Sequence, residues 1–154
     1  MLRDHQGLWI SGFSARVGLA TNNMAELAAV RQGLVMAWNA NVKLLQLELD
    51  SRVVLTWLTN KNMNYPTNML PLICDCRKLL DQEWEVHMQH VYCEANGCAD
   101  DLAKRGTYQQ NLITIYSECP TFVNVLYVRD LSSLGNLGFV PQVQVLMLYE
   151  LTFL

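Results

Sequence analysis

The sequence predicts an α/β domain that contains parallel strands, and three observations lead to this fold class. Segments with strand-like alternation are each followed by a segment with helical periodicity. Strands that alternate with helices usually form a parallel sheet with right-handed crossovers. The chain has 154 residues, of which 51% are apolar and 16% are charged. One domain of this length and composition can bury a substantial core.

The expected elements follow from local patterns along the chain. Residues 1–3 resemble the end of a strand, and a turn at 4–7 leads into a strand at 8–14. A helix is expected from residues 21–23 onward, because apolar side chains recur at helical intervals as far as Trp38. The patterns further predict a strand at 44–49, a helix at 51–60, a helix beginning at Asn68, a strand at 84–90 and a helix at 96–105 that ends at Gly106.

The last part of the chain has a different character. From residue 107 to 134 the pattern weakens to apolar pieces around Pro120, and residues 135–154 carry no charged side chain except Glu150. We therefore expect a domain over residues 1–134 followed by an apolar C-terminal tail at 135–154.

Composition limits the class of protein. The formal net charge is −3, which counts against a strongly basic nucleic-acid binder but leaves room for local phosphate contacts. The five cysteines are odd in number and form no Cys-x-x-Cys pair, so we expect an intracellular protein with reduced thiols. Because no run of about 18 apolar residues occurs, we expect no membrane segment.

Three acidic residues stand at informative places. Glu26 opens the first long helix, Asp50 closes a strand, and Asp100 lies in the first turn of a later helix. Sites in α/β sheets form outside the carboxyl ends of parallel strands. Carboxylates that converge there repel one another unless a cation holds them, and Mg²⁺ is the natural choice for oxygen ligands.

Each acid also has a purely structural explanation. Glu26 has capping-box spacing from Asn23, and Asp100 can complement a helix dipole. Asp50 can be a solvated residue at a strand end. His90 is equally compatible with an ordinary strand-end histidine.

The local strings around these residues resemble the type 1 ribonuclease H domain, in the branch found in plant retroelement-derived proteins. Residues 21–27 read TNNMAEL, residues 48–51 read ELDS, and residues 90–103 read HVYCEANGCADDLA. The last string is similar to the family's H…EAN…AD.LA signature. The resemblance extends from Met1 to about Leu134 and implies a ribonuclease H-like mixed sheet flanked by helices.

The resemblance also implies a chemistry. Members of the family hydrolyse the RNA strand of an RNA–DNA hybrid with two Mg²⁺ ions held by carboxylates. By this likeness Glu26, Asp50 and Asp100 are expected to bind metal, and His90 is expected on a mobile loop that assists catalysis. The likeness assigns contacts with the hybrid to three asparagines, which are Asn22, Asn23 and Asn96.

One family motif is missing from this sequence. The family carries an Asp-Gly-Ser motif on its central first strand, and this sequence contains no such tripeptide. We therefore expect an N-terminally truncated domain with the central strand missing and with weak or no catalysis. The alternatives are a non-catalytic remnant that binds nucleic acid and a fragment without function. Of the segments that could lie beside residues 45–49, we favour the 8–14 hairpin over the C-terminal tail, because a shorter loop costs less entropy.

Overall fold

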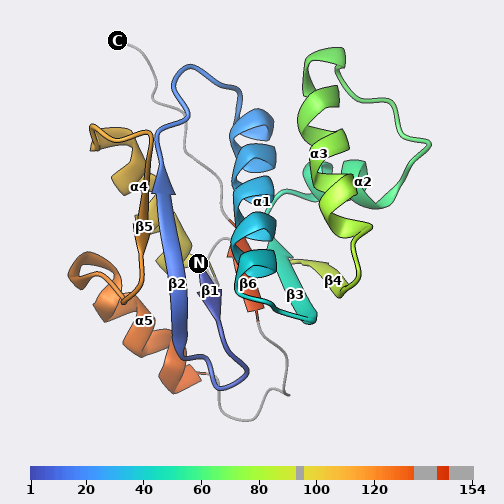
Figure 1. Cartoon of the computed structure of the whole chain (residues 1–154). Helices are drawn as coiled ribbons and strands as arrows, with labels where there is room; N and C mark the ends of the chain where they lie inside the picture. Colours follow the sequence, from blue (N-terminus) through green and yellow to red (C-terminus); the bar gives the residue numbers. More distant parts are fainter. Residues whose placement is uncertain (93–95, 134–141, 146–154) are drawn as a thin grey trace.

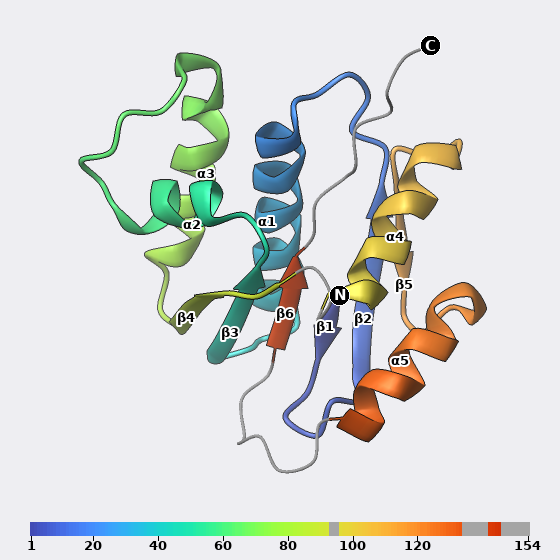
Figure 2. The same ribbon diagram turned by 180° about the vertical axis from the view of Figure 1, so that it is seen from behind.

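The computed structural model describes residues 1–92, 96–133 and 142–145 of the chain. Among these residues six strands form one mixed sheet, in the order β4-β3-β6-β1-β2-β5. Helices α1, α2 and α3 lie on one face of this sheet, and α4 and α5 lie on the opposite face (Figures 1 and 2). The mixed α/β sheet flanked by helices confirms the predicted fold class.

The elements lie close to their expected positions. The strands are β1 (Leu2–Arg3), β2 (Trp9–Ala15), β3 (Leu44–Leu49), β4 (Glu85–His90), β5 (Ile113–Tyr116) and β6 (Gln142–Val145). The helices are α1 (Asn22–Asn39), α2 (Arg52–Thr59), α3 (Leu70–Leu80), α4 (Gly97–Tyr108) and α5 (Thr121–Ser133), and a short 3₁₀ turn, η1 (Thr67–Met69), precedes α3. Strand β5 and helix α5 fall where the sequence pattern was weak.

Strand β6 corrects the expectation for the centre of the sheet. It pairs in parallel with β3, from Gln46↔Gln142 to Leu49↔Val145, and antiparallel with β1 at Leu2↔Val143. Residues 142–145 of the C-terminal tail, and not the β1–β2 hairpin, therefore lie beside β3. The expected hairpin neighbour was wrong: loop length does not decide the pairing, because a doubled loop costs only about 0.6 kcal/mol, whereas each unpaired buried backbone group costs about 1–3 kcal/mol.

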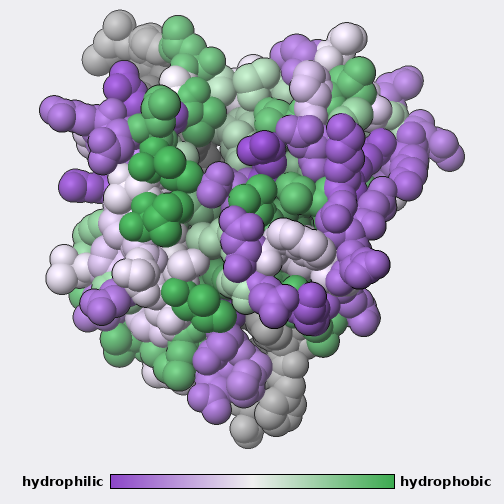
Figure 3. Space-filling view, in the orientation of Figure 1, coloured by the Kyte–Doolittle hydropathy of each residue, from purple (hydrophilic) through white to green (hydrophobic). Residues whose placement is uncertain are grey.

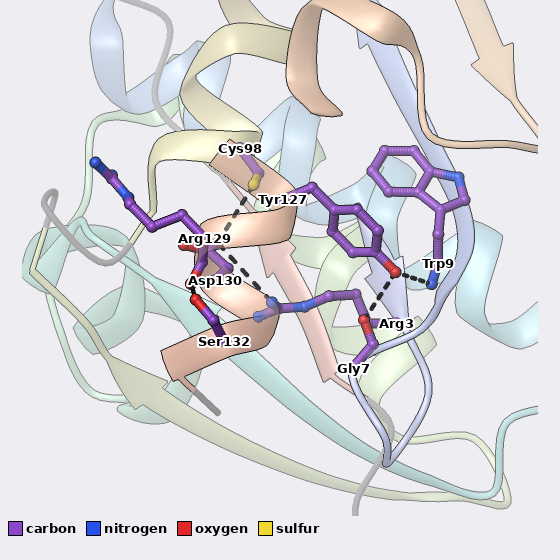
Figure 4. Close-up of polar contacts among 8 residues, drawn as sticks. All are labelled: Arg3, Gly7, Trp9, Cys98, Tyr127, Arg129, Asp130 and Ser132. Carbon is purple, nitrogen blue, oxygen red and sulfur yellow. Dashed lines mark hydrogen bonds and ion pairs between the residues drawn. The ribbon is translucent and has the colours of Figure 1, made fainter. Parts of the chain in front are cut away.

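The hairpin stays away from β3 because other contacts hold it. Strand β2 pairs antiparallel with β5 over Gly12–Ala15. The Tyr127 hydroxyl of α5 accepts a hydrogen bond from the Trp9 backbone N–H at 2.7 Å and donates one to the Gly7 carbonyl at 3.1 Å. Figure 4 shows these bonds, together with the ion pair between Arg3 and Asp130 and the bond from the Cys98 thiol to Asp130. Helix α5 thus fixes the hairpin around its turn, and β5 pairs with the far end of β2.

The main core lies between the sheet and the helices α1, α2 and α3. Leu45, Leu47 and Leu49 of β3 are fully buried there, as the alternation of that strand predicts. A second, smaller cluster lies under α4 and α5 and includes Leu102 and Val123. Because one cluster packs against each face of the sheet, a missing central strand would leave a gap between the two clusters.

Gly106 has a different role from the expected helix end. Helix α4 continues through it to Tyr108. A Cβ atom at Gly106 would lie within 2.2 Å of the Ala15 carbonyl oxygen, so this position needs glycine to let α4 approach β2 closely.

The surface is divided into an apolar and a polar part. Figure 3 shows apolar residues over the β2 and β5 side of this face and hydrophilic residues over α3 and its preceding loop. Exposed apolar side chains in those two strands include Ile10, Ile113 and Ile115. Across the part of the chain that the structure describes, no helix is both long enough and apolar enough to cross a membrane.

Candidate metal-binding active site

Helix α1 positions Glu26 inside the protein. Thr21 is the N-cap of this helix, and its hydroxyl accepts a hydrogen bond from the Met24 backbone N–H at 3.3 Å. The capping-box explanation through Asn23 is therefore wrong. Glu26 follows one turn later on the inward face and has no exposed surface. A fully buried carboxyl needs a partner, because an isolated buried charge is very costly.

Asp50 is that partner. It directly follows β3, and its carboxyl group is within hydrogen-bonding reach of the Glu26 carboxyl group. The pKa of Glu26 is raised from 4.5 to about 9, mainly by burial, and the negative charge of Asp50 and the hydrogen bond to it contribute in the same direction. The Ser51 backbone N–H lowers the Glu26 pKa by a smaller amount. Near neutral pH the pair therefore shares one proton.

The pKa of Asp50 is also raised, mainly by burial. Its own backbone N–H, the proton of Glu26 and the side chain of Asn96 act in the opposite direction. Asp50 is thus the member of the pair that other groups stabilise as an anion.

The oxygen atoms of this pair fit a hard cation. Both carboxyl oxygens of Glu26 and Oδ1 of Asp50 are buried and lack a hydrogen bond of ordinary geometry within the described residues. One shared proton can form a hydrogen bond with only some of these three oxygen atoms. A divalent cation such as Mg²⁺ accepts several carboxylate oxygens at once and would displace the proton.

His90 also reaches the site. It is the last residue of β4, paired with Leu49, and not part of the loop that follows. Its Nε2 lies 3.1 Å from the Asp50 carbonyl oxygen, and its ring packs edge-on against Tyr92. The parallel β3–β4 register therefore places the histidine beside the aspartate.

Asp100 has a different immediate partner. In the first turn of α4, its Oδ2 lies 2.6 Å from Nζ of Lys104, which also lies 3.7 Å from Oδ1 of Asp101. Its Oδ1 is buried and lacks a hydrogen bond among the described residues. Within those residues no three His, Cys, Asp or Glu side chains are grouped closely enough to hold one metal ion. The convergence of Asp100 with Glu26 and Asp50 therefore stays a prediction. Lys104 was not among the site residues expected from the sequence, although its i,i+4 spacing from Asp100 is visible there.

The three asparagines lie in different environments. Asn22 is exposed and Asn23 is half-buried at the start of α1, so both border solvent close to Glu26. Asn96 has no exposed surface, and its side chain acts to lower the pKa of Asp50. The side chains of Asn22 and Asn23 are thus accessible to nucleic acid, whereas Asn96 lies in the protein interior.

A separate cavity of about 450 Å³ lies between β2, α1 and α4. Its lining includes Phe13, Ala29 and Leu102 but none of the three carboxylates. The cavity is therefore not the place of the acidic chemistry.

Comparisons with known proteins identify the family of the chain. A family described as reverse transcriptase-like matches residues 1–106. A protein of Arabidopsis thaliana, named provisionally as a ribonuclease H protein, is 39% identical over 104 residues, which are 67% of this chain and 16% of that protein. The chain therefore spans about a sixth of the length of this relative. No solved structure matches the chain significantly.

Proposed function

Since the chain belongs to the reverse transcriptase-like family and has a ribonuclease H-like domain, we propose that it hydrolyses the RNA strand of RNA–DNA hybrids with Mg²⁺. The observation that carries the proposal is the buried Glu26–Asp50 pair, whose oxygens need a proton or a cation. A structural ion pair would instead join an acid to a base.

The described residues suggest a role for each part of the site. Glu26 and Asp50 would hold the cation, and Asp100 would add a third carboxylate on release from Lys104. When bound, Mg²⁺ supplies a Lewis acid that activates water and stabilises the leaving oxygen. Because His90 Nε2 donates to the Asp50 carbonyl oxygen, its Nδ1 would be the atom that accepts or releases a proton.

The substrate surface would lie at the start of α1. Asn22 and Asn23 present amide groups to solvent at this end of the helix, next to Glu26. Amide side chains can bond to base edges and to the 2′-hydroxyls that distinguish RNA from DNA.

We expect hydrolysis to be slow in this chain. The sequence supplies three of the four carboxylates that the resemblance implies, since it has no Asp-Gly-Ser motif. Strand β6 occupies the centre of the sheet with the residues Gln-Val-Gln-Val and adds no carboxylate there. The loss of one metal ligand lowers such rates on the order of a thousandfold.

The test is cleavage of a hybrid whose RNA strand is labelled, with and without Mg²⁺. The proposal requires slow RNA-strand cleavage that EDTA stops and that Asp50→Asn abolishes. Asp81→Asn, at an exposed residue after α3, is the matched control and should retain the activity. Retention of the hybrid without any cleavage would favour the alternative, a nucleic-acid-binding remnant that uses Asn22 and Asn23.

A further inference from the structure

The cavity between β2, α1 and α4 lies where β2 has no neighbouring strand on one side. Strand β1 reaches β2 no further than the pair Leu2↔Ser11, whereas β5 pairs with β2 as far as Ala15. From Phe13 onward, no strand among the described residues covers the β1 side of β2. Helices α1 and α4 lie on opposite faces of the sheet (Figures 1 and 2), and both line the cavity beside this stretch of β2.

The wall of the cavity is mostly apolar and has the size of a small-molecule site. Phe13 of β2 and Leu102 of α4 line it, and small side chains at Ala28, Ala29 and Ala103 leave the space between the helices open. The volume of about 450 Å³ falls within the range of roughly 300–1,000 Å³ that is typical of pockets for small organic molecules. An apolar wall of this size favours a ligand with an apolar body.

The charged side chains that line the cavity have a positive sum among the described residues. Arg31 and Asp75 neutralise each other, since Nε of Arg31 lies 3.1 Å from Oδ2 of Asp75. Arg16 also lines the cavity and is exposed to solvent, and it forms no ion pair within the described part of the chain. The lining therefore has an uncompensated positive charge at Arg16, although the formal net charge of the chain is −3.

A carboxylate is the chemical group that suits this charge. The planar guanidinium of an arginine binds a carboxylate through two parallel N–H bonds. Gln32, which is half-buried and lines the same cavity, adds an uncharged amide donor. Arg16 would repel a cationic ligand, and an uncharged ligand would gain little from it.

We propose that this cavity binds a small organic carboxylate with an apolar body. The carboxylate pairs with Arg16, and the apolar part lies between α1 and α4 against Phe13 and Leu102. Glu26, Asp50 and Asp100 do not line the cavity, so this binding site is separate from the proposed cation site and does not depend on hydrolysis of hybrids.

The experiment compares 2-naphthoate with its uncharged amide, 2-naphthamide, by calorimetry on the full chain at pH 7.5. The two compounds have nearly the same shape, so the difference between their affinities isolates the charge of the carboxylate. We expect 2-naphthoate to bind about fivefold more tightly, as is typical of one solvent-exposed ion pair. Equal affinities for the two compounds would overturn the proposal.

Arg16→Gln removes the charge and keeps an amide of intermediate length. It should abolish the preference for 2-naphthoate and leave the affinity for 2-naphthamide unchanged. Arg52→Gln is the matched control, because Arg52 is an exposed arginine of α2 that does not line the cavity. It changes the net charge by the same amount and should keep the preference. A preference that survives in Arg16→Gln, or that disappears equally in Arg52→Gln, would refute the role of Arg16.

A second variant tests the place of binding. Ala28→Leu fills part of the cavity with a good helix former and should weaken the binding of both compounds. Ala103→Leu fills it from the opposite helix and serves if the first variant does not unfold cooperatively in urea. Wild-type affinity in the filled variant would place the compounds elsewhere and overturn the proposal. Binding only to a chain that ends at Val145 would mean that residues 146–154 occupy the cavity, and would overturn it as well.

Discussion

The Glu26–Asp50 pair makes the stability of the metal-free protein depend on pH. In the folded chain the pKa of Glu26 is about 9, because burial and the adjacent Asp50 disfavour its anion, and in the unfolded chain it returns to about 4.5. The folded state therefore keeps a proton that the unfolded state releases between these pH values. The stabilising contribution is complete below pH 4.5 and is lost as the pH rises towards 9.

The expected size follows from proton linkage. Within this interval each pH unit removes about 1.4 kcal/mol of unfolding free energy. In EDTA, the unfolding free energy of the wild-type chain should therefore fall by up to about 3 kcal/mol between pH 6 and pH 8 because of Glu26. Glu26→Gln carries no titrating proton, so its unfolding free energy should change little over that range and should exceed that of the wild type at pH 8.

The assay is urea unfolding followed by far-ultraviolet circular dichroism at pH 6, 7 and 8. Glu83→Gln, at an exposed glutamate before β4, is the control and should keep the wild-type slope. Equal pH slopes for the wild type and Glu26→Gln would refute the shared proton. Added Mg²⁺ should stabilise the wild type more at pH 8 than at pH 6, because the cation competes with the proton.

Three further predictions concern the fold. Tyr127→Phe should lower the unfolding free energy by about 1–3 kcal/mol, since two hydrogen bonds to the hairpin disappear; Tyr108→Phe, at an exposed tyrosine of α4, should change it little, and equal effects would contradict the role of the hydroxyl. Val143→Pro should destabilise the chain by at least about 1–3 kcal/mol, because β6 has a paired strand on each side; an unchanged urea midpoint would place β6 outside the sheet. Iodoacetamide should label the half-buried Cys74 in the native protein and Cys76 only on unfolding, because burial raises the pKa of the Cys76 thiol to about 12; mass spectrometry showing equal rates would disprove this protection.

The elements of the fold could be predicted where the signal is local. The alternation of Leu45, Leu47 and Leu49 gave the correct strand and its buried face, because side-chain direction in a strand depends only on sequence position. The order and spacing of the motif strings led to the prediction that Glu26, Asp50 and Asp100 converge. The structure places Glu26 beside Asp50, and the convergence of Asp100 with them stays a prediction.

Other features depend on which groups meet after the chain has become compact. Asn23 and Thr21 both suit a helix start, and only the backbone geometry shows that Thr21 is the cap. Gly106 suits a helix end, yet the approach of Ala15 determines its role. Asn96 suits a cap or a contact with nucleic acid, and only the folded structure shows that it is fully buried and that its side chain does not cap α4.

The sequence by itself determined the strands and helices up to residue 106, the family and the acidic residues, because periodicity and motif strings are properties of neighbouring residues. Tertiary structure alone decided that residues 142–145 lie between β1 and β3. The physical reason is that backbone N–H and C=O groups are the same in every residue, so the sequence does not label a partner for an open strand edge. The edge pairs with whichever extended segment the rest of the fold leaves within reach.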